Sequence, residues 1–343
     1  MYQLLNTLYV TTPGAYLRLD HDTVKVQVEH ETLLQTPLLH LGGIVCIGRV
    51  NMSPALIQRC AQDGRAIVFH DSRGRFAARV VGPTGGNVLL RRAQHEALSN
   101  PEQTAAIGRN IVAGKLQNSR QLLLRGAREA RDEPDRMALR EAADRLADVL
   151  RRLEDRDDPQ QIRGLEGEAA RAYFQVFGRL IRADREQFGF SGRVRRPPIG
   201  RVNALLSFLY ALLLNDCIAA AEAVGLDPQV GFLHTLRPGK PALALDLMEE
   251  LRSVLADRLA LTLINRRQIA AGDFEERPGG AMHLTDDSRR RVISAYQRRK
   301  QEELSHPLLG RQLPLGLVPH IQARLLARHL RGDLEAYPPF LTR

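Results

Sequence analysis

The sequence predicts an α+β protein in which an N-terminal β-sandwich domain, residues 1–95, precedes an all-α C-terminal domain, residues 96–343. Two observations predict this class. Short apolar or alternating segments separated by turn signals are confined to the N-terminal part, whereas apolar residues farther along the chain recur with helical spacing. The length of 343 residues and the apolar content of 44% are sufficient for two domains with buried cores.

The N-terminal domain is expected to hold several short strands and one helix. Residues 24–28 alternate apolar and polar side chains, which is the pattern of a half-buried strand. Ser53 followed by Pro54 predicts the start of a helix that runs to Cys60, because serine caps a helix and proline fits its first turn. Turn signals such as Asp63-Gly64 separate the remaining expected strands, which are 32–36, 43–47, 66–69 and 76–81.

The C-terminal domain is expected to consist of long helices. Asn100-Pro101-Glu102 predicts the start of a helix, and Gly332 predicts the end of one. The spacing of apolar residues predicts helices at 101–126, 135–154, 164–188, 202–224, 241–260, 286–304 and 316–331.

The balance of charges points to a phosphate-bearing partner without requiring one. The net charge is +10, and the 49 basic residues comprise 45 Arg and only 4 Lys. Arginine grips phosphate through two parallel hydrogen bonds, although heavy arginine usage also follows from a GC-rich genome. Aromatic residues make up 5% of the chain and Trp is absent, which argues against a carbohydrate platform or a reader of stacked bases.

Cysteine usage and apolar runs indicate the compartment. The three cysteines are far apart and form no CxxC or Cys/His spacing, which argues against a zinc site or a disulfide framework. The first residues lack the features of a signal peptide, and the longest apolar run, 204–214, is too short to span a bilayer. The expectation is a soluble cytoplasmic protein with no membrane partner.

Common catalytic motifs are missing. The chain has no GxGxxG, no GxxxxGK[ST], no HExxH and no GxSxG. Nucleotide hydrolysis and serine-type acyl transfer therefore have no support.

Three segments bring metal-ligand residue types into apolar surroundings. Glu166 is flanked by small residues that leave room for a ligand, although Glu166 and Glu168 could simply favour a helix N-terminus electrostatically. His234 closes the apolar turn that begins at Gly231, and it could equally be a satisfied core residue.

Asp246 and Glu249 are the third segment. They stand three apart, so their carboxylates share one face of a helix, and both interrupt an apolar stripe where a solitary carboxylate is costly to bury. A divalent cation would remove that cost, and pairing with Arg252 would do so equally well.

A basic stretch near the C-terminus is the remaining feature. Arg324, Arg328 and Arg331 fall on one face of a predicted helix, a geometry suited to contacting successive phosphates. The alternative is a solvated face balanced by nearby acidic residues such as Asp333.

Together these segments resemble the CRISPR-associated spacer-acquisition endonuclease, the integrase subunit of CRISPR adaptation, in a form close to that of subtype I-C systems. The motifs follow the order of that family over most of the chain, and as a set they are specific to it. They are Leu165-Glu166-Gly167, Tyr173-Phe174, Asn203-Ala204-Leu205-Leu206-Ser207-Phe208, Gly231-Phe232-Leu233-His234, Leu245-Asp246-Leu247-Met248-Glu249-Glu250-Leu251-Arg252, Asn265-Arg266, His306-Pro307 and residues 322–332.

The resemblance implies a dimerising β-sandwich and a helical catalytic domain that holds one divalent metal, Mg²⁺ or Mn²⁺. It implies Glu166, His234 and Glu249 as the catalytic metal ligands, with Asp246 supporting them. Many members carry Asp where this chain has Glu249, and the helix register decides whether Glu249 or the adjacent Glu250 faces the metal.

The resemblance also implies the reaction and the partners. The expected activity is a metal-dependent DNA endonuclease and integrase, in which the 3′-hydroxyl of a captured DNA fragment attacks the end of a CRISPR repeat. The expected partners are double-stranded DNA, a second copy of the chain, and a small ferredoxin-like adaptation protein in a heterohexamer-type complex. The residues expected to contact DNA are Lys240 and Arg252, which flank the acidic helix, together with Arg324 and Arg328.

Two other function classes compete with this interpretation. A non-enzymatic helical DNA- or RNA-binding protein would bind without metal-dependent cleavage, but the sequence shows no compact helix-turn-helix unit of the kind a regulator uses. A scaffold whose carboxylates merely pair with arginines would have no affinity for metal.

Overall fold

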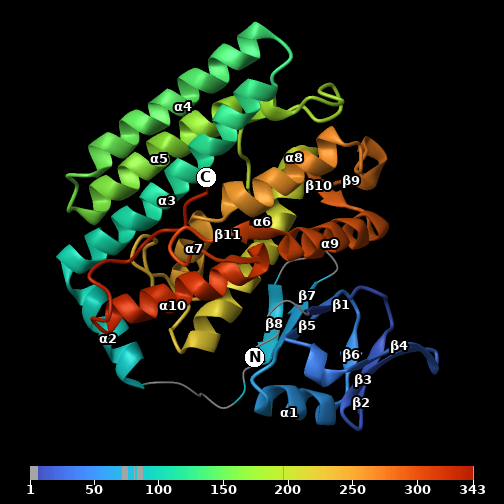
Figure 1. The fold of residues 1–343 in the computed structure, drawn as a ribbon. Coiled ribbons are helices and arrows are strands. Elements are labelled where there is room, and N and C mark those ends of the chain that lie inside the picture. The colour runs from blue at the N-terminus through green and yellow to red at the C-terminus, as the bar shows by residue number, and fades with distance from the viewer. Residues whose placement is uncertain (1–6, 72–75, 81, 83–87, 196, 343) are drawn as a thin grey trace. The chain divides into compact units, whose positions relative to one another are not determined.

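The computed structural model describes residues 7–71, 76–80, 82, 88–195 and 197–342 (Figure 1). By its internal contacts the chain divides into two compact units. Unit 1 comprises Met1–Gly86 together with Asp286–Gln301, and unit 2 comprises Asn87–Thr285 together with Glu302–Arg343.

Unit 1 contains two four-stranded sheets. The first has the order β1-β5-β7-β8, in which β8 is antiparallel to β7 and the other pairs are parallel. The second has the order β4-β3-β2-β6, in which only β6 runs parallel to its neighbour. The bounds are β1 Thr7–Val10, β2 Tyr16–Asp20, β3 Thr23–Val28, β4 Glu31–Pro37, β5 Gly43–Ile47, β6 Asn51–Met52, β7 Ala66–His70 and β8 Phe76–Val80.

The two sheets share one hydrophobic core with helix α1 (Pro54–Gln62). Val24 and Val26 of β3, on one side of the alternating strand, are buried in the same cluster as Ile44 of β5 and Cys60 of α1. The predicted start of α1 is confirmed, because the Ser53 side chain accepts a hydrogen bond from Leu56 N and Pro54 is the first helical residue. The strand expected at 76–81 is present through Val80, and position 81 lies outside the described residues.

Helix α9 (Asp286–Gln301) belongs to unit 1 by its contacts. Its Arg290 Nε donates a hydrogen bond to Thr11 Oγ1 at 3.1 Å. The helix expected at 286–304 ends earlier, at Gln301, because the chain continues as strand β11 (Glu303–Ser305).

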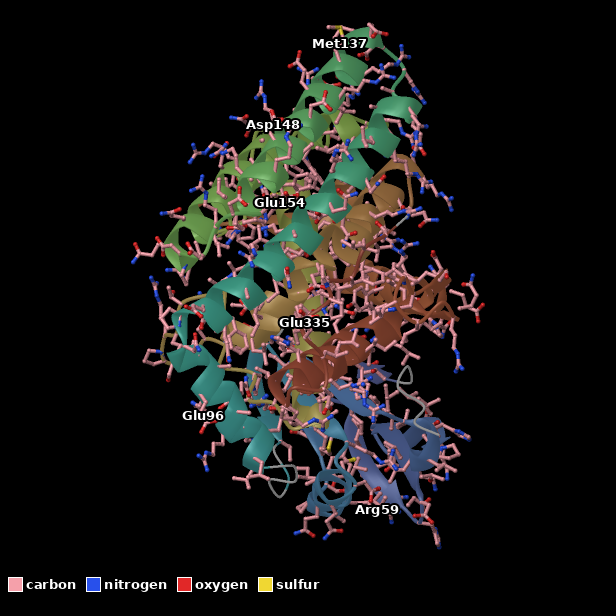
Figure 2. All side chains as sticks on the ribbon, turned by 60° about the vertical axis from the view of Figure 1, so that its left-hand side comes forward. Arg59, Glu96, Met137, Asp148, Glu154 and Glu335 are labelled. Carbon is pink, nitrogen blue, oxygen red and sulfur yellow. The ribbon has the colours of Figure 1, made fainter. Side chains whose placement is uncertain are left out.

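Unit 2 is built from long helices, of which α3, α4 and α5 pack side by side (Figure 1). Their starts are capped by Asn100, Asp132 and Asp158, whose side chains accept hydrogen bonds from backbone N–H groups of the first turn. Figure 2 shows charged side chains projecting from the helices of unit 2, among them Glu96 of α2 and Asp148 of α4. The bounds are α2 Val88–Ser99, α3 Pro101–Glu129, α4 Glu133–Leu153, α5 Pro159–Val176, α6 Arg201–Val224, α7 Ala242–Glu249, α8 Arg258–Asn265 and α10 Val318–Leu330.

Helix α6 is the core helix of unit 2. It packs against α7, α10 and β10. By length and composition it is the one helix among the described residues that could cross a membrane, and 61% of its most apolar window is buried inside the protein, as expected for a helix at the centre of a helical domain.

Two predicted helices are interrupted. The helix expected at 164–188 ends at Val176 with a 3₁₀ turn, Phe177–Leu180, because Asn265 holds the next residues: its side chain accepts from Arg182 N at 2.7 Å and donates to Leu180 O at 3.0 Å. The helix expected at 241–260 breaks after Glu249 and continues through a π-helical segment, Arg252–Asp257, into α8.

The C-terminal region is rich in helices but also contains strands, so the expectation of an all-α domain was wrong. Two hairpins occur there, β9 (Phe274–Arg277) with β10 (Ala281–Leu284), and β11 with β12 (Gln312–Pro314). Between β9 and β10, Gly279 and Gly280 have φ of +86° and +76°, a backbone conformation that favours glycine. The mixed architecture of N-terminal strands and a helix-rich remainder is confirmed.

Candidate active site

Four elements of unit 2 bring the candidate residues together. Glu166 lies on α5, Glu249 ends α7, and His234 lies in the loop before α7. Lys115 of α3 joins the two glutamates, because its Nζ contacts Glu166 Oε1 and lies 2.7 Å from Glu249 Oε2. His234 Nε2 lies 3.8 Å from Glu249 Oε1. The three residues predicted to act together are therefore neighbours.

Glu166 stands at the edge of the buried stripe of α5. Leu165, Ala169 and Tyr173 of that helix are buried, whereas the Glu166 side chain is 26% exposed. The helix begins at Pro159, so Glu166 is more than one turn from its start and the helix-dipole alternative does not apply. A Cβ added to Gly167 would meet open space, which leaves the neighbourhood of Glu166 accessible.

Glu168 faces elsewhere. Its two carboxylate oxygens accept hydrogen bonds from Arg152 at 2.8 and 2.9 Å on the exposed surface between α4 and α5. Glu168 is thus not part of the cluster around Lys115.

The loop that carries His234 is wrapped around the carboxylate of Asp246. The backbone N–H groups of Phe232 and Leu233 donate to Asp246 Oδ2 at 2.6 and 3.0 Å, and that of His234 donates to Oδ1 at 2.9 Å. This approach requires glycine at 231, because a Cβ there would lie 2.6 Å from Asp246 Oδ2 and 2.6 Å from the Ala242 backbone.

Asp246 also orients the imidazole. Its Oδ1 lies 2.7 Å from His234 Nδ1, so the neutral ring keeps its proton on Nδ1 and the lone pair on Nε2 faces Glu249. A carboxylate behind the ring is the usual support for a metal-binding histidine. The supporting role of Asp246 stays a prediction with which this placement is compatible. The His234 side chain is satisfied by Asp246, but at 25% exposed it is not a fully buried core residue.

Glu249 is ionised in a buried position. Desolvation alone would raise its pKa, but the charges of Arg252 and Lys115 lower the pKa to about 2. Arg252 Nη2 lies 3.0 Å from Glu249 Oε1, so the expected pairing with Arg252 is present alongside the contact with His234. Glu249 Oε2 makes no well-directed hydrogen bond, although Lys115 Nζ lies 2.7 Å away.

Glu250 points away from this cluster. Its carboxylate accepts hydrogen bonds from Tyr337 Oη at 2.6 Å, Phe340 N at 2.7 Å and Gln322 Nε2 at 2.9 Å. Burial raises the pKa of Glu250 to about 8 against these hydrogen bonds. The helix register therefore directs Glu249, and not Glu250, toward Lys115 and His234.

The donors are not gathered around a common point. Within the part of the chain that the structure describes, no three His, Cys, Asp or Glu side chains lie close enough together to hold a metal ion. The ammonium group of Lys115 lies between Glu166 and Glu249, and this cation keeps the two carboxylates paired.

Lys115 is the site residue that sequence reasoning missed. One signal was available, because Lys115 is one of only four lysines in a chain with 45 arginines and lies in an apolar stretch of α3. Neither its distance along the chain from Glu166 nor its neighbours in sequence indicate the two carboxylates that it contacts.

The residues expected to bind DNA lie at different places. Arg252 adjoins the cluster, and Lys240 lies in the loop before α7, where desolvation and the charge of Arg237 lower its pKa. Arg324 and Arg328 are exposed on one face of α10, whereas the neighbouring Arg331 pairs with Asp333 at 2.9 Å.

Comparisons with known proteins give the family. The family model described as CRISPR associated protein Cas1 matches residues 8–298. A protein of Moorella thermoacetica named CRISPR-associated endonuclease Cas1 1 is 63% identical over 343 residues, 100% of both chains.

Solved structures show the same fold. A casposase bound to integration product has a TM-score of 0.81 at 22% identity, covering 96% of this chain and 92% of that chain. A partial Cas6-RT-Cas1–Cas2 complex has a TM-score of 0.67 at 25% identity, covering 97% and 98%. Since the family model spans most of the sequence and a curated relative aligns along its full length, the chain belongs to the Cas1 family of CRISPR-associated proteins.

Proposed function

We propose that this protein is a metal-dependent DNA endonuclease and integrase that inserts captured DNA fragments into a CRISPR array. Its family membership and the name of its 63% identical relative support a nuclease. One observation carries the proposal. Glu166, Glu249 and His234 lie close together beside Arg252, and the ammonium group of Lys115 contacts both glutamates.

The residues present fit a divalent cation by their chemistry. Two carboxylates and one imidazole, without thiolate, suit Mg²⁺ or Mn²⁺, and the imidazole favours Mn²⁺. The buried Glu249 Oε2 makes no well-directed hydrogen bond, and a positive charge, that of Lys115, already lies between Glu249 and Glu166. Glu166, His234 and Glu249 would hold the cation, which when bound would polarise the phosphoryl oxygens and ease ionisation of an attacking hydroxyl.

Two other residues of the site would orient a metal ligand and neutralise charge on the substrate. Asp246 keeps the proton of His234 on Nδ1, so that Nε2 is available as a donor atom. Arg252 places a guanidinium group beside Glu249, where it can neutralise charge on a phosphate. No side-chain nucleophile is required, in agreement with the absence of serine and cysteine motifs from the sequence.

The reaction we propose is a transesterification. The 3′-oxygen of the captured fragment forms a bond to the phosphorus at the repeat end, and the bond from that phosphorus to the 3′-oxygen of the adjoining nucleotide breaks. The attacking hydroxyl gives up its proton and the leaving oxygen takes one up, so charge balances. Water in place of the 3′-hydroxyl gives strand cleavage at the same site.

The assembly follows the same proposal. Unit 1, whose two sheets share one core, would be the β-sandwich through which two copies of the chain pair. The similarity to a chain of a partial Cas6-RT-Cas1–Cas2 complex supports a Cas2 partner, which would be the small ferredoxin-like adaptation protein of a heterohexamer on double-stranded DNA.

Titration with Mn²⁺ followed by calorimetry, together with a DNA-joining assay, tests the proposal. Glu166→Gln, His234→Ala and Glu249→Gln should each lose most Mn²⁺ binding and most joining. Glu168→Gln is the matched control, because Glu168 lies on the same helix as Glu166 and its ion pair among the described residues is with surface Arg152.

Each result that differs from these expectations identifies the part of the proposal that is wrong. Full Mn²⁺ binding and joining in one of the three variants would remove that residue from the ligand set. DNA binding by the wild-type protein without Mn²⁺-dependent joining or cleavage would favour the non-enzymatic alternative, and a lack of Mn²⁺ affinity would favour a scaffold.

A further inference from the structure

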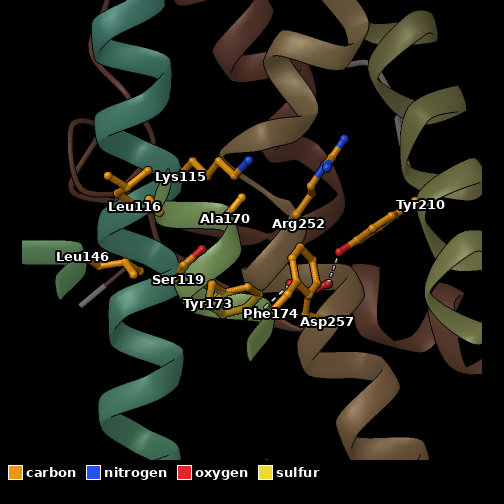
Figure 3. Close-up of a pocket in the computed structure, with 11 residues that line it drawn as sticks. Lys115, Leu116, Ser119, Leu146, Ala170, Tyr173, Phe174, Tyr210, Arg252 and Asp257 are labelled. Carbon is orange, nitrogen blue, oxygen red and sulfur yellow. Dashed lines mark hydrogen bonds between the residues drawn. The ribbon is translucent and has the colours of Figure 1, made fainter. Parts of the chain in front are cut away.

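A second buried polar cluster lies beside the candidate active site. Asp257 accepts a hydrogen bond from Tyr210 Oη at 2.6 Å on one oxygen and from Tyr173 Oη at 2.8 Å on the other (Figure 3). All three residues are buried. The proposed reaction gives none of them a role.

A pocket connects this cluster to the site. Its cavity volume is about 20 Å³, and its polar lining comes from Lys115, Ser119, Tyr173, Tyr210, Arg252 and Asp257. Figure 3 shows Lys115 of α3 and Arg252 of the π-helical segment on the same side of this pocket, with Asp257 deeper along that segment.

The π-helical segment explains why Arg252 and Asp257 face the same pocket. Residues five apart in an α-helix point about 140° away from each other. A π-helix closes its hydrogen bonds between residues five apart, so Arg252 and Asp257 at its two ends come to the same side. The irregular turn after Glu249 thus brings an arginine and a carboxylate to one wall.

Tyr210 lies between these two groups. The Arg252 guanidinium carbon lies 4.9 Å from the centroid of the Tyr210 ring, and the hydroxyl of the same ring donates to Asp257. A guanidinium over a tyrosine ring is attracted to the ring face and keeps its plane fixed. Arg193 contacts the same ring at 5.3 Å and donates to Asn203 Oδ1 and Ser207 Oγ of α6.

Arg252 has donors left for a ligand. Nη2 lies 3.0 Å from Glu249 Oε1, whereas the buried Nε makes no hydrogen bond with any residue in the described part of the chain. A phosphate oxygen that reached this site would supply an acceptor. Because the position of the guanidinium depends on the Tyr210 ring, anything that shifts the ring shifts these donors.

We infer that Asp257 and Tyr210 are positioning residues: Asp257 holds the Tyr210 ring, with Tyr173 as its second donor, and the ring holds Arg252 where it meets the scissile phosphate. The inference rests on the proposed function. It adds that the π-helical segment and the two tyrosines serve the reaction through Arg252, beyond their contribution to packing.

A double-mutant cycle tests this coupling. Tyr210→Phe keeps the ring and removes the hydroxyl donated to Asp257, and Tyr210→Leu also removes the ring. In the wild-type background the second should slow Mn²⁺-dependent DNA joining about a hundredfold, the lower end of the loss typical of removing one charge-stabilising donor. The first should slow it less, about tenfold, because the ring remains under Arg252. In an Arg252→Gln background neither should slow joining further, because the group through which they act is gone.

The matched control is Tyr337→Phe. Tyr337 is also buried and also donates its hydroxyl to a carboxyl group, that of Glu250. Its loss should lower the free energy of unfolding as much as Tyr210→Phe does, with no matching loss of joining. Urea unfolding of each variant shows that the measured protein is folded.

The outcomes separate the inference from the proposed function. If Tyr210→Phe slows joining equally in the wild-type and Arg252→Gln backgrounds, or does not slow it in the wild type, the inference is overturned. If the wild-type protein does not join DNA at all, the proposed function fails. In that case the double-mutant cycle is repeated with DNA-binding affinity as the measured quantity. Tyr210→Phe should then weaken DNA binding only when Arg252 is present. Equal weakening in both backgrounds overturns the inference.

Discussion

Lys115 of α3 and Glu249 of α7 face each other, with 2.7 Å between Nζ and Oε2, and the same ammonium group contacts Glu166 of α5. The Glu249 side chain is 2% exposed and that of Lys115 is 12% exposed. One cation thus joins carboxylates from two separate helices at the place where the proposed function puts a metal. A divalent cation bound by these carboxylates would have to displace the ammonium group.

Lys115→Met should therefore have opposite effects on the two forms of the protein. Without metal, the variant should lose about 3 kcal/mol of unfolding free energy, because removing one partner leaves a buried carboxylate poorly compensated. Mn²⁺ should bind the variant more tightly than the wild type and stabilise it more, since no ammonium group competes. Urea unfolding and calorimetric titration with Mn²⁺ measure both effects.

The control for that variant is Lys25→Met. Lys25 also forms an ion pair, with Asp20, but it lies in unit 1 and is partly exposed. Its loss should change the unfolding free energy by less than about 1 kcal/mol and leave Mn²⁺ affinity unchanged. Weaker Mn²⁺ binding by Lys115→Met than by the wild type would show that Lys115 supports the metal instead of competing with it.

Gly231→Ala should destabilise the loop that carries His234. The new Cβ would lie 2.6 Å from Asp246 Oδ2 and 2.7 Å from Leu243 N, both fixed by the fold. The expected cost is about 3 kcal/mol of unfolding free energy, measured in urea, because overpacking against backbone cannot relax cheaply. Gly164→Ala is the control: its Cβ would meet open space within α5, so the variant should gain about 0.5 to 1 kcal/mol. Equal stabilities of the two variants would contradict the close approach at Gly231.

Glu250→Gln should remove one component of the pH dependence of stability. Burial raises the pKa of Glu250 from 4.5 to about 8. Between these values the folded protein holds a proton that the unfolded chain has lost. The stabilisation is complete below the lower value and is lost as pH rises through the upper one, by up to about 1.4 kcal/mol per pH unit.

Glutamine fits this position as a neutral mimic. Its carbonyl oxygen can accept from Phe340 N and Gln322 Nε2, which now donate to Oε2, and its amide nitrogen can donate to the Tyr337 oxygen. Urea unfolding at about pH 5 and about pH 8 compares the two proteins. The wild type should lose more stability over that interval than the variant, and equal losses would show that Glu250 is ionised in the fold.

The elements around the site could be predicted wherever local signals decide the structure. Asn100 and Ser53 cap helices as their neighbours in sequence indicate, and Asp246 and Glu249 share one face of α7 as their spacing predicts, the face that His234 approaches. The caps and the shared helix face depend on residues within one or two turns of each other. For that reason, periodicity and helix-capping rules can predict them.

What could not be predicted depends on contacts distant in sequence. Lys115 acquires its role from Glu166 and Glu249, which reach it from other helices. The π-helical segment after Glu249 has no signature in its own residues, yet it decides that Arg252 and Asp257 share one wall. The choice between Glu249 and Glu250 likewise follows from a C-terminal segment that surrounds Glu250.

Arg324 and Arg328 should contribute to DNA binding through charge alone. They stand four apart on the exposed face of α10, whose opposite face buries Leu325 and Leu326, and neither forms an ion pair with another described residue. Replacing both with Glu should weaken DNA binding and reduce the slope of log affinity against log salt, by up to about 0.9 for each phosphate that is no longer neutralised. Replacing both with Lys keeps the charge, so the slope should stay close to that of the wild type while the bidentate geometry is removed. A slope that is the same in the Glu variant and the wild type would make this face a solvated surface, the alternative that the sequence left open, because a surface that touches no phosphate releases no counterions on binding.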